Sequence, residues 1–387
     1  MSIAIIGAGI SGVTTAYFLS KYNLQVDLIE SRRYPAMATS YANGGQLSAS
    51  NSQAWNSWEN IITGIKGFIR KDSPVLLNPM PSLEKFVWLI SFMKNIKHKD
   101  SISYEICKMA VESVKLYRKI ASEEKINFDL LNKGIIHFYN TKTQTEKALK
   151  ANDIYNKAGL ERFRITHDDC YKIEPSLRSK KFDSIFYTPS DKTGDIHKFC
   201  NNLTKHLIKN KKIKLIKKEV IDLKSELKIY KNIIVCAGVN SSKLAKSINE
   251  KLPIYPVKGY SITVNRPGQN APWVSLLDDE NKIVTSRLGS QRLRIAGSAE
   301  FNGFNLDIIQ NRVRPLINWC TNLFPNINTN DIKPWAGLRP MTPNMLPITR
   351  VSKYNKRIWF NTGHGHLGWT LSAITAKNIS QKISQLY

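Results

Sequence analysis

The chain has 387 residues, of which 42% are hydrophobic and 10% aromatic, a composition that supports a packed core and excludes a largely disordered protein. Its length exceeds a single ordinary domain core, so we expect two domains or one elaborate α/β domain. The formal net charge of +27 attracts nucleic acid, anionic lipid or acidic metabolites, although it does not determine the fold.

The first 30 residues predict a strand, a glycine-rich turn, a helix and a second strand. The strands are Ile3–Ile6 and Gln25–Glu30, and the helix is Ser11–Lys21. Continuous apolar strands beside amphipathic helices indicate a parallel sheet that is covered on both faces. Because the first strand follows Met1 with neither a basic segment nor a cleavage site, we expect no export by a signal peptide and a cytoplasmic location.

The middle of the chain alternates predicted helices with short strands. A polar loop of small residues, Ala38–Ser52, precedes helices over 83–97 and 101–124. Thr193 or Asp195 is the expected N-cap of a further helix that extends to about Lys209. The expected strands of this region, which are rich in β-branched and aromatic residues, are Gly134–Tyr139, Ser184–Thr188, Ile213–Leu223 and Asn232–Cys236.

The last third predicts a second sheet, followed by a unit like the one at the start. The expected strands of this more antiparallel sheet are Tyr255–Val264, Lys282–Arg287 and Arg292–Gly297, and the helix Ile308–Leu323 ends before Pro325. A strand, a glycine-rich loop and a helix then close the chain, at Ile358–Asn361, Thr362–Gly368 and Trp369–Gln385. We therefore expect a nucleotide-binding domain formed from both ends of the chain, with a second domain inserted between them.

The N-terminal turn carries a dinucleotide-binding pattern, with Gly7, Gly9 and Gly12 between strand and helix. The first glycine permits a tight turn, the second lets the backbone approach a pyrophosphate, and the third lets the helix pack on the strand. The helix N-terminus offers free N–H groups to the phosphates. Glu30 ends the second strand, where an acid accepts hydrogen bonds from ribose hydroxyls. The pattern serves FAD and NAD alike, so it leaves the cofactor open.

Five longer motifs resemble the glycine oxidase/D-amino acid oxidase superfamily of FAD-dependent oxidoreductases, and within it the small subunits of bacterial D-amino acid dehydrogenases. They are Thr39–Gln46, Thr193–Asp195, Tyr255–Ser261, Trp335–Pro343 and Trp359–Thr370. The resemblance runs nearly end to end and implies FAD as the cofactor. It implies an α/β fold, α+β overall, in which a Rossmann-like FAD-binding domain interleaves with a substrate domain built on a mixed, largely antiparallel sheet. The implied FAD-binding domain comprises 1–50, 100–125, 191–250 and 335–387, and the substrate domain comprises 51–99, 126–190 and 251–334.

The resemblance also implies roles for individual residues. The arginine of the Gly-Leu-Arg-Pro motif binds the substrate carboxylate in these enzymes, which makes Arg339 the expected anchor, because a guanidinium offers two parallel bonds to a carboxylate. Arg294 lies on a strand that is beside the flavin in this superfamily, so we expect either a catalytic cation near flavin N5 or a solvent-facing residue. His364 and His366 are expected to orient the flavin rather than to carry protons, and His366 stands where the resembling proteins usually have Thr. The expected cofactor-binding residues are Gly7, Ala8, Gly9, Ile10, Ser11, Gly12, Glu30, Ser31, Ser40, Asn43, Gly45, Gln46, Val220, Ala237, Gly238, Gly363, His364, Gly365, Leu367, Gly368, Trp369 and Thr370.

The cysteines and three departures from the family pattern bear on the cofactor and the substrate. Relatives that bind flavin covalently through a Cys place it close to the position of Arg339, where this chain has none, so we expect dissociable FAD. No two cysteines have C-x-x-C spacing, so we expect reduced thiols and no metal site. The runs Thr342–Pro347 and Ser372–Thr375 and the early end at Tyr387 depart from the family pattern and leave the substrate open.

Together these features predict oxidative deamination of a small amino acid, of the D configuration, to a 2-oxo acid and ammonia. A hydride would pass from Cα to flavin N5, and the electrons would go on to a quinone or another respiratory acceptor. Three other functions stay open: an oxygen-using oxidase of glycine, sarcosine or hydroxyproline, a flavoprotein acting on transfer RNA, and a non-catalytic flavin-binding protein. Nucleic acid is not the expected partner, because the basic residues are scattered and no known nucleic-acid module occurs.

The segment Leu83–Met93 is a candidate for docking on an anionic membrane surface. Its apolar and aromatic residues are followed by Lys94, Lys97 and Lys99. Such a helix lies in the headgroup region, and each nearby cation adds on the order of 1 kcal/mol of attraction to anionic lipid. We therefore expect peripheral docking on the inner face of the cytoplasmic membrane, and the alternative is that Phe86–Met93 packs into the substrate domain.

Overall fold

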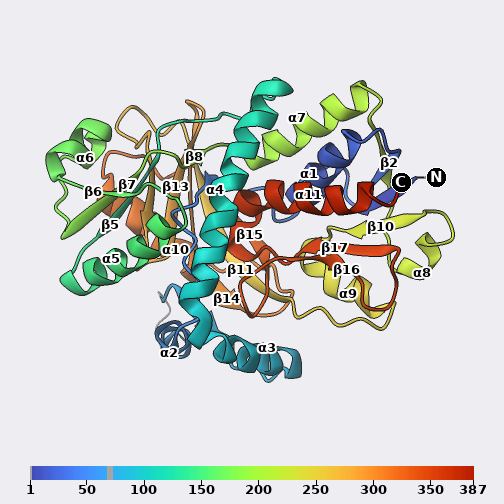
Figure 1. The fold of residues 1–387 in the computed structure, drawn as a ribbon. Helices are drawn as coiled ribbons and strands as arrows, with labels where there is room; N and C mark the ends of the chain where they lie inside the picture. Colours follow the sequence, from blue (N-terminus) through green and yellow to red (C-terminus); the bar gives the residue numbers. More distant parts are fainter. Residues whose placement is uncertain (1, 68–72) are drawn as a thin grey trace.

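The computed structural model describes residues 2–67 and 73–387, which form two large sheets with helices around them (Figure 1). The first sheet has six strands in the order β16-β17-β10-β1-β2-β9. Five of them are parallel, and β16 pairs antiparallel to β17 at one edge. The strands are β1 (Ile3–Ile6), β2 (Val26–Glu30), β9 (Ile213–Lys217), β10 (Asn232–Val235), β16 (Ile348–Val351) and β17 (Ile358–Thr362).

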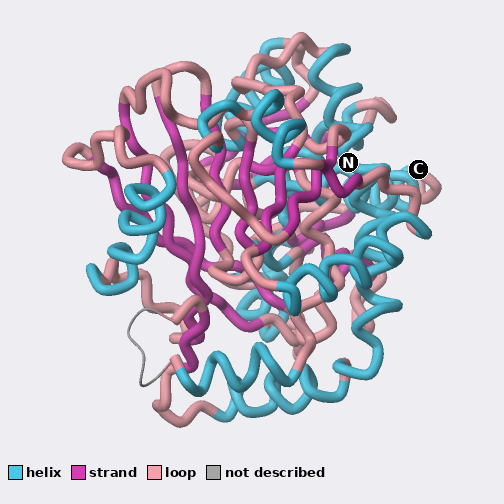
Figure 2. Tube along the Cα trace, turned by 90° about the vertical axis from the view of Figure 1, so that its left-hand side faces the viewer, coloured by secondary structure: helices cyan, strands magenta, loops and turns pink. Residues whose placement is uncertain are grey.

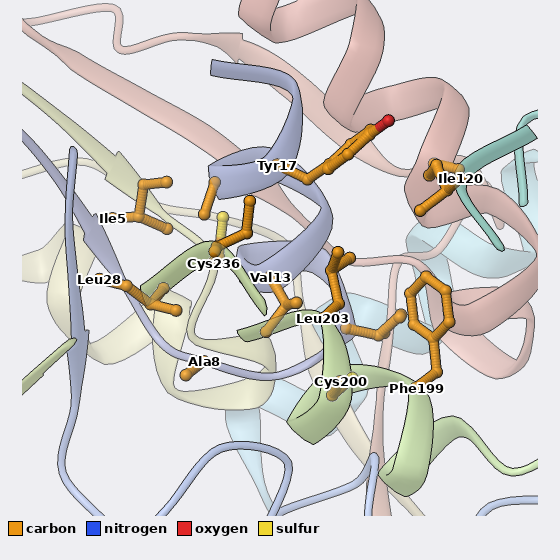
Figure 3. Close-up of a cluster of buried hydrophobic side chains, with 14 of the residues drawn as sticks. Ile5, Ala8, Val13, Tyr17, Leu28, Ile120, Phe199, Cys200, Leu203 and Cys236 are labelled. Carbon is orange, nitrogen blue, oxygen red and sulfur yellow. The ribbon is translucent and has the colours of Figure 1, made fainter. Parts of the chain in front are cut away.

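The first sheet is covered on both faces, as predicted, because its central strand β1 is apolar at every position. Ile3 and Ile5 pack into a cluster with the helices of one face, part of which Figure 3 shows, whereas Ala4 and Ile6 pack on the other face. The helices of the first face are α1 (Ile10–Ser20), α4 (Lys99–Glu123), α7 (Ile196–Lys209) and α11 (Gly368–Ser384). The short helices α8 (Leu223–Glu226) and α9 (Ser241–Lys246) pack on the other.

The second sheet has nine strands and is mixed and largely antiparallel, which confirms the predicted fold class. Its path is β15-β11-β14-β13-β12-β5-β7-β6, with β4 paired to β14. The parallel pairs are β12 with β5 and β14 with β4. The strands are β4 (Val75–Leu77), β5 (Ile135–Tyr139), β6 (Phe163–Ile165), β7 (Ser184–Thr188), β11 (Tyr255–Asn265), β12 (Ser275–Asp278), β13 (Ile283–Leu288), β14 (Arg292–Phe301) and β15 (Ile332–Met341).

The remaining elements connect or flank these sheets. The two-stranded pair β3 (Gln46–Leu47) and β8 (Lys192–Thr193) joins two distant loops. Helices α2 (Trp58–Lys66) and α3 (Leu83–Lys94) lie together at one end of the long helix α4, apart from the first sheet (Figures 1 and 2). The others are α5 (Lys142–Lys157), α6 (His167–Ile173), α10 (Gln310–Leu323) and the 3₁₀ turns η1 (Ile96–His98), η2 (Pro175–Leu177), η3 (Gly238–Asn240) and η4 (Gly365–Leu367).

The structure corrects three expectations about single elements. The predicted strand Ile213–Leu223 is too long, because β9 ends at Lys217 and Leu223 begins α8 behind the capping side chain of Asp222. The predicted helix 83–97 is α3 followed by the 3₁₀ turn η1. Strand β15 was not predicted; it contains Pro334 and Pro340, which a strand tolerates at the edge of a sheet, where β15 lies. The predicted domain boundary at residue 335 falls inside this strand, and the division into domains stays a prediction.

Candidate cofactor and substrate site

A cavity of about 530 Å³ lies where the carboxyl ends of β1, β2, β10 and β17 meet strands β11, β14 and β15 of the second sheet. Ligands of open α/β sheets bind at this end of the strands. Residues of both sheets therefore line one continuous space. Its lining includes Gly7 and Glu30 at the side of the first sheet, and Gly259, Gly297 and Arg339 at the side of the second.

The glycine turn after β1 requires its glycines for packing. Gly7 has a φ of +101°, and a Cβ there would lie 2.7 Å from the carbonyl oxygen of Cys236. A Cβ on Gly12 would lie 1.8 Å from the carbonyl oxygen of Gly7. The turn therefore brings the N-terminus of α1 against β1 and β10. The N-cap of this helix is Gly9, which has no side chain to cap it. The N–H of Ile10 donates to Ser40 Oγ at 3.2 Å, and the other N–H groups of the first turn present partial positive charge to the cavity.

The Glu30 carboxylate is held at the wall of the cavity by backbone donors. Oε2 accepts from the N–H of Ala8 and Oε1 from the N–H of Arg32, both at 2.9 Å. The side chain is thereby fixed at the end of β2, where an acid binds ribose hydroxyls in dinucleotide folds. Arg32 also lines the cavity and was not among the expected residues.

Two buried polar atoms on the cavity wall have no hydrogen-bond partner among the described residues. They are Oε1 of Gln46 and Nε1 of Trp369. The other amide atom of Gln46 donates to Ser275 Oγ at 2.7 Å and to the Leu276 carbonyl at 3.1 Å, which fixes the side chain. Because buried polar groups rarely stay unpaired, an unpaired acceptor and an unpaired donor on residues that line one cavity fit a ligand with hydrogen-bonding groups on its edge, such as a flavin ring.

The loop between β17 and α11 brings two neutral histidines to the cavity. Burial lowers the pKa of His364 to about 4, and its Nε2 lies 2.9 Å from Thr375 Oγ1. Burial, with the charges of Arg339 and Lys282, lowers the pKa of His366 to about 3. Both side chains are uncharged at neutral pH and lie beside the uncapped N-terminus of α11.

The Arg339 guanidinium is a positive charge at the cavity wall with no carboxylate beside it in the part of the chain that the structure describes. Nη1 donates to the Ser298 carbonyl at 2.7 Å, and Nη2 lies 3.5 Å from the Gly297 carbonyl. Burial lowers its pKa to about 10, which leaves it charged at neutral pH. The guanidinium lies across Gly259, where a Cβ would be 2.3 Å from Nη2. A charged group that binds only carbonyls and opens to a cavity fits an anionic ligand.

Five of the expected site residues are not among those that line the cavity. Arg294, expected beside the flavin, is buried and donates from Nε to Thr263 Oγ1 at 2.9 Å and from Nη1 to the Asn43 carbonyl at 3.1 Å. These bonds make it a support for the loop that carries Asn43. Val220 packs against the core on the far face of the first sheet. Ala8 and Gly12 act through the backbone of the turn, as described above. Gly363 is the fifth; it has a φ of +75°, and a Cβ there would lie 2.8 Å from Thr342 Cγ2. All the other expected residues line the cavity.

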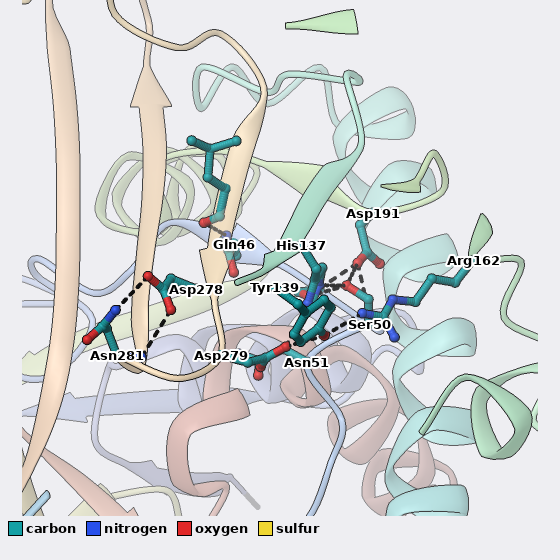
Figure 4. A network of polar contacts seen from close by, with 12 residues as sticks. Gln46, Ser50, Asn51, His137, Tyr139, Arg162, Asp191, Asp278, Asp279 and Asn281 are labelled. Atoms are coloured by element: carbon teal, nitrogen blue, oxygen red, sulfur yellow. Dashed lines mark hydrogen bonds and ion pairs between the residues drawn. The ribbon is translucent and has the colours of Figure 1, made fainter. Parts of the chain in front are cut away.

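A network of buried polar contacts lies behind the cavity wall, as Figure 4 shows. Asp191 accepts from the N–H groups of Ala49 and Ser50 at 2.8 and 3.1 Å, and Ser50 Oγ lies 2.7 Å from Nε2 of His137. Nδ1 of His137 is 3.2 Å from Oδ2 of Asp279, which lines the cavity. Burial raises the pKa of Asp191. This network thus fixes the loop before residue 51 against the second sheet.

Sequence reasoning missed Trp55, Asp279 and Lys282, which also line the cavity. Trp55 stacks on His366 with ring centroids 4.5 Å apart. None of the three lies in a recognisable motif, and only the acidic run at 278–280 between two predicted strands gave a signal.

Comparison with known proteins adds to this geometry. Residues 2–382 match the model of the DAO family, described as FAD dependent oxidoreductase. The chain is 46% identical to D-amino acid dehydrogenase 3 of Mesorhizobium japonicum, with 99% of this chain and 97% of that protein covered. It is 33% identical to D-amino acid dehydrogenase of Dechloromonas aromatica, with the same coverage. Its fold is similar to that of glycine oxidase from Geobacillus kaustophilus, with a TM-score of 0.76, 18% identity, and 98% of this chain and 94% of that chain covered.

Proposed function

Because the chain belongs to the DAO family of FAD-dependent oxidoreductases, we propose that it oxidatively deaminates a small D-amino acid to the 2-oxo acid and ammonia. The observation that carries this proposal is the Arg339 guanidinium, which is charged, buried among carbonyls and open to the cavity. The D configuration is supported by the names of the two relatives that are 46% and 33% identical to this chain.

Each part of the cavity has a task in this reaction. FAD, when bound, supplies the acceptor for a hydride. The N-terminus of α1 and the Glu30 carboxylate would hold its pyrophosphate and ribose, and Gln46 and Trp369 offer hydrogen bonds to the flavin ring. Arg339 would bind the substrate carboxylate with two parallel bonds, and this fixes the Cα–H bond in one orientation. The uncapped N-terminus of α11 would add partial positive charge beside bound FAD.

The electron acceptor that we propose is a quinone, reached by docking on an anionic membrane surface. The candidate contact is a set of exposed apolar side chains, here called the α2–α3 surface, made of Trp58, Ile62, Ile65, Met80, Leu83, Phe86 and Val87. Leu83 is 78% exposed and Phe86 is 62% exposed. Large apolar side chains that gather on one face of a soluble fold mark interaction sites, and basic residues at the end of α3, such as Lys94 and Lys97, suit anionic lipid.

The apolar residues of Leu83–Met93, which the sequence predicts to form one docking surface, are partly buried and partly exposed in the structure. Trp88 is buried, stacks with Phe92 at 5.3 Å and donates from Nε1 to the Met341 carbonyl at 3.0 Å, so it anchors α3 to the second sheet. Leu83, Phe86 and Val87 remain exposed. No helix in the described ranges is long and apolar enough to cross a membrane.

A product assay tests the reaction and its acceptor together. The holoenzyme is incubated with D- and L-enantiomers of small amino acids, once with oxygen alone and once with a water-soluble quinone. The proposal expects 2-oxo acid and ammonia in equal amounts from a D-enantiomer, formed rapidly with the quinone. Hydrogen peroxide formed at a comparable rate with oxygen alone would instead identify an oxidase. Absence of both products with every amino acid would refute the amino-acid reaction.

A further inference from the structure

We infer that Nδ1 of His366 accepts a hydrogen bond from the amino group of the substrate while Arg339 holds its carboxylate. The inference rests on the proposed function and adds the residue that recognises the amine. It follows from three fixed features of the loop between β17 and α11: the plane of the ring, its hydrogen bond and the β-bridge that holds this loop beside the strand of Arg339.

The plane of the His366 ring is fixed by stacking. Trp55 lies against it with centroids 4.5 Å apart and planes inclined by 22°. Both residues line the cavity. Trp55 therefore covers one face of the imidazole and holds its plane in place.

The tautomer of His366 is fixed by its hydrogen bond. Nε2 lies 3.4 Å from the carbonyl oxygen of Asn51, and a carbonyl can only accept, so Nε2 carries the hydrogen. That carbonyl is held in place because Asp191 binds the N–H groups of the two preceding residues, Ala49 and Ser50 (Figure 4). Nδ1 is left with a lone pair and has no hydrogen-bond partner among the described residues. Burial and the nearby charges of Arg339 and Lys282 keep the ring unprotonated, so the lone pair stays available at neutral pH.

His366 and Arg339 are held near each other by the backbone. A β-bridge joins His364 to Met341. His366 is two positions from His364, and Arg339 is two positions from Met341. The charge of Arg339 bears on the pKa of His366. An α-amino acid carries its carboxylate and amino group on one carbon, so a cation and a neutral acceptor on neighbouring parts of one wall match the two groups. No proton or electron needs to move for this recognition, since both the ammonium and the free amine donate N–H.

The test compares ligands with and without an amino group, using the holoenzyme under anaerobic conditions. The Kd of a reducing D-amino acid is obtained from the saturation of flavin reduction, and that of propionate from the change that it causes in the flavin spectrum. His366→Leu should raise the Kd of the amino acid about 10- to 100-fold, as expected for a lost bond to a charged donor, and change that of propionate less than about twofold. His366→Gln, whose amide oxygen can accept, should recover part of the affinity.

Two controls keep the inference falsifiable. Arg339→Ala should weaken both ligands, because both carry a carboxylate. His206→Leu, which removes a histidine of α7 that pairs with Glu124 outside the cavity, should change neither. Equal weakening of both ligands in His366→Leu, or an unchanged amino-acid Kd, would overturn the inference while wild-type flavin reduction still upholds the proposed function. A wild-type flavin that no amino acid reduces would overturn the proposed function and this inference with it.

Discussion

At the scale of single residues, Arg339 combines a fixed position with an unmatched charge. Replacing it with Ala removes two charge-assisted bonds to the substrate, each worth about 1.5–3 kcal/mol, so kcat/KM should fall on the order of 100-fold or more. Arg339→Lys should fall between Ala and wild type, because a single ammonium cannot form the two-bond fork. Steady-state kinetics and the FAD content of each variant provide the measurement. Near-normal kcat/KM in the Ala variant would place the carboxylate anchor elsewhere.

Gly259 determines whether the Arg339 side chain can lie where it does. In Gly259→Ala the new Cβ would be 2.3 Å from Nη2, so the guanidinium must move. We expect FAD to remain bound and KM for the amino acid to rise about tenfold or more. Gly159→Ala is the matched control: its φ of +84° makes the substitution costly, but nothing lies within 4 Å of the new Cβ. It should lower stability and leave KM unchanged. Equal KM values in both variants would contradict the role of Gly259.

At the scale of elements, two glycines of the turn between β1 and α1 have different roles, one in packing and the other in cofactor binding. Gly12→Ala places a Cβ 1.8 Å from the Gly7 carbonyl, which should force the helix from the strand and destabilise the fold by about 1–3 kcal/mol or more. Gly9→Ala meets only Ser40 Oγ, at 3.5 Å, so it should fold normally but bind FAD more weakly. Thermal unfolding of the apoproteins and FAD titration distinguish the two effects. Identical stability losses in both variants would refute this division.

The α2–α3 surface makes a separate prediction about membranes. Leu83→Ser with Phe86→Ser should reduce co-sedimentation with anionic vesicles, because apolar burial and charge attraction act together there. Ile221→Ser with Ile229→Ser is the control, since these residues are 79% and 63% exposed but lie by α8, on another part of the molecule. Binding should also weaken at high salt. Equal binding by both double variants, or no binding by the wild type, would contradict docking through this surface.

The elements that the sequence predicted most accurately are those with the strongest local sequence patterns. The strands β1 and β7 were predicted to the residue, and α7 with its Asp195 cap nearly so, because apolar runs and a capping side chain mark them. Strand β15 was missed although its Arg339 was expected to bind substrate, because its prolines and Gly337 disguise an edge strand. Trp55 and Lys282 reach the cavity only through the tertiary fold, and no local pattern marks them. The support role of Arg294 likewise depends on a partner, Asn43, that is 251 positions away.

At the scale of the whole molecule, buried neutral histidines should make the fold sensitive to acid. The pKa of His364 is about 4 in the folded chain, below the ordinary value of 6.5, so below pH 6.5 the unfolded chain binds a proton that the folded chain does not. This contribution to stability is complete above about pH 6.5 and is lost as the pH falls to about 4. Its size is on the order of 3 kcal/mol. Denaturant unfolding of wild type and His364→Gln, at saturating FAD, should show a shallower loss in the variant. Parallel curves would contradict the assignment.

The proposed function requires FAD that is bound without a covalent link and reduced by an amino acid in the cavity at Arg339. All five thiols are unpaired and buried, and burial raises the pKa of Cys236, the one that lines the cavity, to about 12, so acid should release intact FAD. The most direct test is anaerobic mixing of the yellow holoenzyme with D- and L-amino acids while the visible absorbance of the flavin is followed. We predict that a small D-amino acid bleaches the flavin, that its L-enantiomer does not, and that Arg339→Ala largely abolishes the bleaching. A flavin that stays oxidised with every amino acid, or bleaching that Arg339→Ala leaves unchanged, would contradict the proposed role of Arg339 and the proposed reaction.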